Sequence, residues 1–160
     1  MHMGLSKNNK YRSDDLLRQL KIIQKYIDEV KAQQVLELGA GNGSNSLYLA
    51  KNNHRLNFIG IDLSKKKSIG DVFNYKQEMG NFHNLNKYPD ESFDLIFVIE
   101  ALCHSTKKNI VLNEVYKKLR KEGLFIIFDG YANKPINQFT DDEVLAKRLT
   151  EKTMAVENFD

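Results

Sequence analysis

The sequence predicts an α/β fold built on a doubly wound, mostly parallel sheet of about five strands with flanking helices. Short apolar runs of strand character alternate along the chain with segments whose apolar residues recur at helical spacing. A glycine-rich turn follows the first apolar run and precedes a helical segment. Repeated strand-then-helix units of this kind give a parallel sheet that helices cover on both faces.

The individual elements follow from these two periods. Apolar residues at helical spacing predict a first helix over 14–31, with Ser13 as its N-cap. Alternation over 72–76 predicts a third strand. The other predicted elements are a strand at 35–38, a helix at 45–51, a strand at 56–61, a strand at 93–99, a helix at 110–120 and a strand at 124–129.

The length of the chain favours a single domain. Its 160 residues, 41% of them hydrophobic, are enough to form one hydrophobic core but too few for two domains. We expect one unit over 1–160, with a helical segment at 13–31 and a core at 32–130. A tail helix is expected at 140–157, opened by the capping box that begins at Thr140.

Composition narrows the function classes. The formal charge of +3 comes from 24 basic and 21 acidic residues, a balance that does not favour nucleic acid as a partner. No apolar stretch approaches the roughly 20 residues that cross a bilayer, so we expect a cytoplasmic protein with no membrane partner. With Cys103 as the only cysteine and no histidine spaced as a ligand, we expect neither a disulfide nor a metal site.

The strongest chemical signal is the glycine loop Gly39-Ala-Gly41-Asn-Gly43, placed between a strand and a helix. Glycines let the chain turn tightly and let a nucleotide-like ligand approach the backbone. Asp62 ends the next strand about twenty residues further on, where the hydroxyls of a ribose would lie. A purely structural turn, with Asp62 as a helix N-cap, is the alternative. Ser44 stands where the dinucleotide fingerprint has its third glycine, which weighs against NAD.

Four segments resemble, in order and approximate spacing, the class I S-adenosylmethionine (SAM)-dependent methyltransferases, which have a Rossmann-like fold. They begin at Glu37, Gly60, Phe93 and Gly123, and the resemblance extends over about 11–129. It implies that SAM is the cofactor and that a small molecule is the methyl acceptor. It also implies these cofactor-binding residues: Glu37 for the methionyl ammonium, Gly39, Gly41 and Gly43 for the methionine and ribose, Asp62 for the ribose hydroxyls, and Leu63, Asn81 and Phe82 for the adenine.

Asn81 departs from the family pattern, because many relatives have an aspartate that meets the adenine amino group. An amide oxygen can accept the same hydrogen bond, so we expect Asn81 to use it.

The segment after the fourth strand, Glu100-Ala-Leu-Cys-His104, resembles the Glu-Ala-x-Cys-His segment of small-molecule and sterol-type methyltransferases. His104 is a candidate general base, since a neutral imidazole can take a proton from a hydroxyl or amine. Capping a helix or shaping the pocket is the alternative role for His104. Glu100 is expected to bind the cationic cofactor rather than to catalyse.

The resemblance ends early, because family members continue with further strands where this sequence has only a helical tail. We therefore expect a truncated form, or self-association through the edge of the strand at 124–129, which is apolar enough to pair with another chain. Two alternatives to a methyltransferase stay open: a non-catalytic or truncated SAM-binding module, and an NAD(P)-dependent oxidoreductase.

Overall fold

The computed structural model describes residue 10, residues 12–64 and residues 70–156. Its elements, in chain order, are the 3-10 turn η1 (Ser13–Leu17), α1 (Arg18–Glu29), β1 (Gln34–Leu38), α2 (Ser44–Asn52), β2 (Asn57–Asp62), β3 (Tyr75–Met79), β4 (Phe93–Ile99), η2 (Leu102–His104), α3 (Lys108–Lys118), β5 (Leu119–Phe128), η3 (Ile136–Gln138) and α4 (Asp141–Met154).

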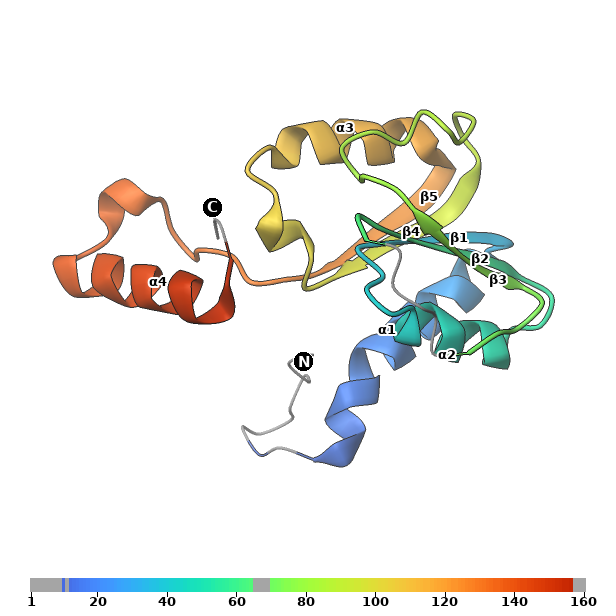
Figure 1. Cartoon of the computed structure of the whole chain (residues 1–160), viewed down its shortest axis with the longest axis horizontal. Helices are drawn as coiled ribbons and strands as arrows, with labels where there is room; N and C mark the ends of the chain where they lie inside the picture. Colours follow the sequence, from blue (N-terminus) through green and yellow to red (C-terminus); the bar gives the residue numbers. More distant parts are fainter. Residues whose placement is uncertain (1–9, 11, 65–69, 157–160) are drawn as a thin grey trace.

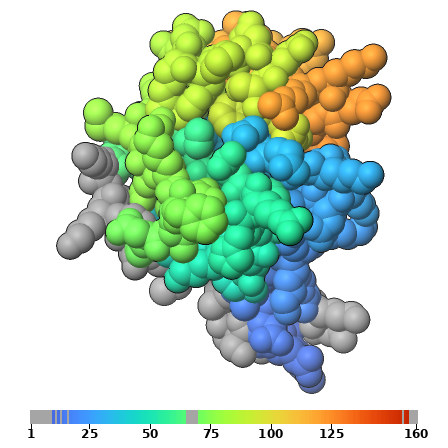
Figure 2. Space-filling model, turned by 90° about the vertical axis from the view of Figure 1, so that its right-hand side faces the viewer, coloured from blue at the N-terminus to red at the C-terminus, as the bar shows by residue number. Residues whose placement is uncertain are grey.

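The five strands form one sheet in the order β3-β2-β1-β4-β5, and every neighbouring pair is parallel. Helices α1 and α2 cover one face and α3 covers the other (Figure 1). Seen from the end of the sheet, the blue and cyan residues of the first layer lie below the yellow-green residues of the second (Figure 2). The predicted α/β fold with flanking helices is confirmed.

The core lies on both faces of the central strands. In β4, Leu95 and Phe97 face α1 and α2, whereas Ile96 and Val98 face α3. All four side chains are fully buried. This two-sided burial explains why the central strands are continuous apolar runs in the sequence.

The third strand begins at Tyr75, three residues later than the predicted start of 72–76. The amide of Asn74 donates to the carbonyl oxygens of Ala50, Asn53 and Leu56 at 3.1, 2.9 and 2.9 Å. These bonds hold the chain before Tyr75 in a turn against the connection between α2 and β2. Alternation alone could not reveal that constraint.

The last strand is longer than predicted, because it begins at Leu119 rather than at residue 124. Leu119 pairs with Phe93 and Leu124 pairs with Leu95, so the residues between them bulge out of the ladder. Glu122 takes a φ of 66° within this bulge. Glu122 and Gly123, which separate the predicted helix at 110–120 from the predicted strand at 124–129, thus lie inside the strand, and α3 ends before them at Lys118.

The helix cap predicted near the N-terminus is wrong by one residue, whereas the one predicted near the C-terminus is confirmed. Arg12, not Ser13, is the N-cap of η1, and its N–H donates to the buried carboxylate of Asp15 at 2.7 Å. Thr140 and Glu143 exchange the expected capping-box bonds at the start of α4. This helix ends at Met154, before the expected end at residue 157, because Ala155 takes a left-handed conformation with a φ of 52°.

Helix α4 stands away from the sheet (Figure 1), and its Leu145 and Leu149 are more than half exposed. These two apolar side chains therefore have little contact with the rest of the described residues. Within the described residues, no helix is both long and apolar enough to cross a membrane.

Candidate functional site

The glycine loop joins β1 to α2, and all three of its glycines have positive φ: 69° at Gly39, 58° at Gly41 and 80° at Gly43. A Cβ at Gly39 would collide with the Cβ of Ala101, and one at Gly43 would collide with the hydroxyl of Tyr75. At Gly41 no atom lies within 4 Å of the Cβ position. Gly39 and Gly43 therefore permit close packing, whereas Gly41 presents bare backbone to open space.

Both peptide groups that flank the Gly41 Cα are tethered. The N–H of Gly41 donates to Asp62 Oδ2 at 2.9 Å, and its carbonyl oxygen accepts from Gln77 Nε2 at 2.7 Å. Asp62 lies at the end of β2 and Gln77 lies in β3, so two neighbouring strands hold the loop. The structure thus brings together Gly41 and Asp62, two residues predicted for the site, and adds Gln77, which the sequence did not single out.

The Asp62 carboxylate is half-buried, and its other oxygen accepts from the N–H and the hydroxyl of Ser64 at 3.1 and 3.0 Å. Its position at the carboxyl end of a parallel strand, beside a tethered glycine loop, is where such sheets bind ligands. A carboxylate there can accept hydrogen bonds from hydroxyl groups of a ligand.

Glu37 is 1% exposed, and its carboxylate accepts hydrogen bonds from α2. One carboxylate oxygen accepts from Asn45 Nδ2 at 2.9 Å; the other accepts from the Ser46 N–H at 3.1 Å and the Ser46 hydroxyl at 2.6 Å. Burial raises the pKa of Glu37 to about 7, these hydrogen bonds lower it in part, and the charge of Asp62 raises it further. In this arrangement Glu37 fixes the first turn of α2 behind the loop; its contact with a ligand ammonium stays a prediction.

This raised pKa predicts a pH-dependent stability. Because the folded-state pKa exceeds the ordinary value of 4.5, the folded chain binds more protons than the unfolded chain between about pH 4.5 and 7. The free energy of unfolding should fall across that window, by about 3 kcal/mol from this residue. Glu37→Gln should abolish most of the fall, as measured by urea unfolding from pH 5 to 8; a variant with the wild-type slope would contradict the assignment.

The residues after β3 form a hydrogen-bonded bridge to the segment after β4. Asn81 Oδ1 accepts from the N–H of His83 at 2.9 Å and lies 2.8 Å from His83 Nδ1. His83 Nε2 lies 2.8 Å from the hydroxyl of Ser105, which is buried. Phe82 is half-buried beside the His83 ring, with ring centroids 4.9 Å apart, and Leu63 is 68% exposed.

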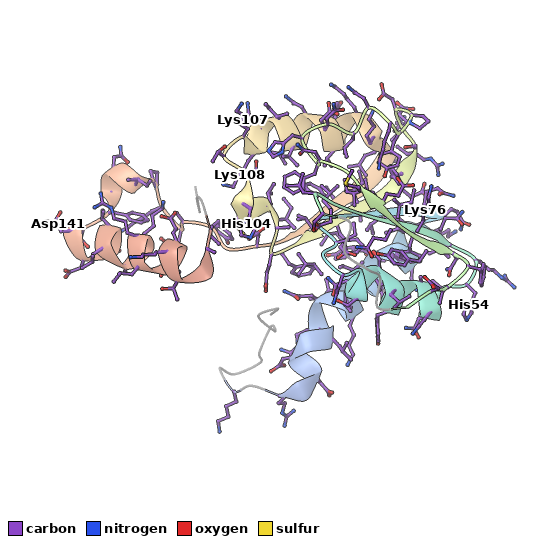
Figure 3. All side chains as sticks on the ribbon, viewed as in Figure 1. His54, Lys76, His104, Lys107, Lys108 and Asp141 are labelled. Atoms are coloured by element: carbon purple, nitrogen blue, oxygen red, sulfur yellow. The ribbon has the colours of Figure 1, made fainter. Side chains whose placement is uncertain are left out.

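On the β4 side, Glu100 follows the strand with a φ of 52°, and its N–H donates to the carbonyl of Phe128 at 2.8 Å. His104 is exposed and lies with Lys107 and Lys108 where β4 and β5 end, whereas His54 lies at the other end of the sheet (Figure 3). Gly39 packs against Ala101, so this turn borders the glycine loop. The predicted residues therefore gather at the carboxyl edge of the sheet.

A cavity of about 390 Å³ opens beside the turn that carries His104. Burial raises the pKa of the Cys103 thiol in its wall to about 12, and the neighbouring Asp129 adds to the shift. The thiol is therefore a poor nucleophile. The lining residues are Leu102, Cys103, Lys108, Ile127, Asp129, Gly130 and Tyr131.

Comparison with known proteins gives one consistent result. Residues 36–127 match the family model described as "Methyltransferase domain". The chain is 30% identical over 105 residues to sterol 24-C-methyltransferase of Eremothecium gossypii, a match that covers 59% of this chain and 27% of that protein. It is 28% identical to phosphoethanolamine N-methyltransferase 3 of Arabidopsis thaliana, over 76% of this chain and 26% of that one.

Among solved structures, the fold is similar to that of a protein from Galdieria sulphuraria described as a candidate sarcosine dimethylglycine methyltransferase. The TM-score is 0.78 at 18% identity, over 99% of this chain and 63% of that one. At this identity the likeness concerns the fold. The chain spans about a quarter of the length of the two curated relatives named above.

Proposed function

Because the chain belongs to the methyltransferase-domain family, whose cofactor is SAM, we propose that it transfers the SAM methyl group to a small-molecule acceptor. The observation that carries the proposal is the backbone of Gly41, which faces open space and is tethered to Asp62 and Gln77. A side chain there would fill the space that a ligand of the loop needs. The residues present fit the cofactor that the family implies.

Each predicted residue has a proposed part in this site. The three loop glycines lie along the methionine and ribose, and Asp62 accepts from the ribose hydroxyls. Leu63, Asn81 and Phe82 border the adenine, and the large exposed surface of Leu63 is apolar area that a purine ring would cover. Glu37 acts on the methionyl ammonium through water, since its own oxygens already bond to α2. Glu100 stabilises the positive charge of the sulfonium.

When bound, SAM supplies an electrophilic methyl group on a cationic sulfur. The chain has to align an acceptor with that methyl and remove the proton that the acceptor loses, so proximity accounts for most of the rate. In the transfer the acceptor's lone pair would form the bond to the methyl carbon, the electrons of the broken carbon–sulfur bond would stay on sulfur, and His104 would take the acceptor's proton. The exposed ring of His104 is open to an acceptor.

The cavity beside η2 supports a small acceptor, because its size and partly apolar wall suit a small organic molecule. The acceptors in the names of the relatives are small molecules of different classes, namely a sterol, phosphoethanolamine and a fatty acid. A cytoplasmic location stays a prediction.

Calorimetric titration tests the first requirement of the proposal, which is that the chain binds SAM. SAM and S-adenosylhomocysteine should bind the chain, and NADH should not. Incubation with methyl-labelled SAM and a panel of hydroxyl, amine and carboxylate acceptors then tests transfer. Binding of both SAM and S-adenosylhomocysteine with no transfer to any acceptor would favour a SAM-binding module that does not catalyse.

The base role of His104 has a separate test. His104→Ala should lower turnover by roughly 10²-fold and leave SAM affinity nearly intact. The shape of the pH–rate profile should differ between wild type and His104→Ala. His54→Ala is the matched control, because His54 is also exposed but lies at the opposite end of the sheet (Figure 3). Equal pH–rate profiles for wild type and His104→Ala would leave His104 as a wall of the pocket.

We further propose self-association as the partner interaction of this chain. β5 is an edge strand of the sheet, and Ile127 within it is 45% exposed. Among the described residues no further strand lies beside β5, and an apolar edge of this kind favours pairing with a strand of another chain.

A further inference from the structure

The side chain of Asn81 is held in one orientation by His83. Two donors of His83, its backbone N–H and its ring Nδ1, lie 2.9 and 2.8 Å from Asn81 Oδ1. The backbone N–H can only donate, so the side-chain atom that meets it must be the oxygen. A carbonyl oxygen has two lone pairs, and both are engaged here.

The protonation of the His83 ring follows from its two partners. Asn81 Oδ1 can only accept, so Nδ1 must carry a proton. Nε2 can then accept from the hydroxyl of Ser105, whose oxygen accepts in turn from the N–H of Lys107 at 3.1 Å. A proton on Nδ1 therefore gives every donor in this set of hydrogen bonds an acceptor.

Asn81 lies at the same edge as the ribose-binding carboxylate. Met79 pairs with Asp62 in the sheet, and the next residue, Gly80, donates its N–H to the Asp62 carbonyl at 2.9 Å. Asn81 follows directly and is exposed. With its oxygen engaged, the group that it offers to a ligand is the amide NH2.

We propose that His83 sets the hydrogen-bonding polarity of Asn81, so that this loop presents a donor to the cofactor purine. An acceptor atom of the ring, such as a purine nitrogen, is then the group that Asn81 recognises. This inference rests on the proposed SAM site. It replaces the expectation, taken from relatives with an aspartate, that Asn81 accepts from the adenine amino group. Asn81 and His83 together become determinants of cofactor specificity.

Asn81→Asp tests the polarity, because an aspartate keeps the oxygen that His83 binds and exchanges the NH2 for an acceptor. We expect the dissociation constant of S-adenosylhomocysteine, measured calorimetrically, to rise about tenfold or more. Asn84→Asp is a matched control: Asn84 is exposed in the same loop, its oxygen accepts the N–H of Asn86 at 3.1 Å, and the charge change is the same. That variant should bind within about twofold of wild type.

The outcomes separate the two proposals. Suppose that wild type binds S-adenosylhomocysteine and that Asn81→Asp binds it at least as tightly as Asn84→Asp does. That result overturns the proposed donor role of Asn81 and leaves the proposed SAM site intact. A folded wild-type chain that binds neither SAM nor S-adenosylhomocysteine overturns the SAM site and this inference with it.

A second measurement needs no ligand. Nitrogen-15 NMR of the His83 ring near pH 8 should show a proton on Nδ1 and none on Nε2. The Nε2–H tautomer would overturn the role of His83 directly.

Discussion

Asp62→Ala is expected to weaken SAM binding by about 10²-fold, through the loss of one to two charge-assisted hydrogen bonds worth roughly 1.5–3 kcal/mol each. The carboxylate also accepts the Gly41 N–H, so its removal frees one of the two tethers of the loop. Calorimetric titration of SAM into the folded variant measures the effect. The chain should still fold, because Asp62 lies at the partly exposed edge of the sheet and not in its core.

Asp94→Ala is the matched control for this substitution. Asp94 also accepts backbone N–H groups, from Gln33 and Gln34 at 2.7 and 2.8 Å, and it pairs with Arg120 at 2.6 Å. It precedes most of β4 and so lies at the opposite, amino edge of the sheet. Its loss should lower stability and spare SAM affinity. Wild-type affinity in a folded Asp62→Ala chain would contradict the ribose assignment.

Gly39→Ala and Gly41→Ala should separate stability from binding. Both place a side chain at positive φ, which costs roughly 1–2 kcal/mol for an ordinary residue. At Gly39 the new methyl also collides with Ala101, so the free energy of unfolding should fall by about 2–4 kcal/mol in total. At Gly41 the methyl meets no protein atom, so only the conformational cost applies, but it enters the space in front of the loop.

SAM affinity should therefore fall at least about tenfold in Gly41→Ala at a modest cost in stability. Urea unfolding and SAM titration on the same two samples provide the comparison. If Gly41→Ala binds SAM as wild type does, the ligand does not approach the loop at this point, and the proposed position of the cofactor is wrong.

The strands that could be predicted from local patterns are those buried on both faces of the sheet, because such burial requires a continuous run of apolar residues. The strand Phe93–Ile99 was predicted at its observed bounds, since an apolar run of that length between polar turns allows little else. The third strand was misplaced because the amide of Asn74 fixes the chain through contacts with residues 18 to 24 positions away. Long-range bonds of this kind leave no trace in the periodicity of a short segment.

In the candidate site too, some residues could be predicted from local sequence patterns and others depend on long-range contacts. Gly41 and Asp62 were found because a glycine turn and an acid at the end of the next strand have a recognisable spacing. Gln77 was missed, since its role depends on the register that places it beside Gly60 of β2. His83 was set aside for lack of metal-ligand spacing, and its partner Ser105 lies 22 positions away across a loop. Only the three-dimensional arrangement pairs them.

The double tether of Gly41 also has a kinetic meaning. Asp62 and Gln77 hold the loop in its binding geometry before any ligand arrives, so little conformational search remains for the encounter. Association should then proceed at a rate set by diffusion and orientation, nearly the same for SAM and for its demethylated product. If the chain acts as proposed, differences between these ligands would lie in how long each stays bound, and product release would be the step at which this loop limits turnover.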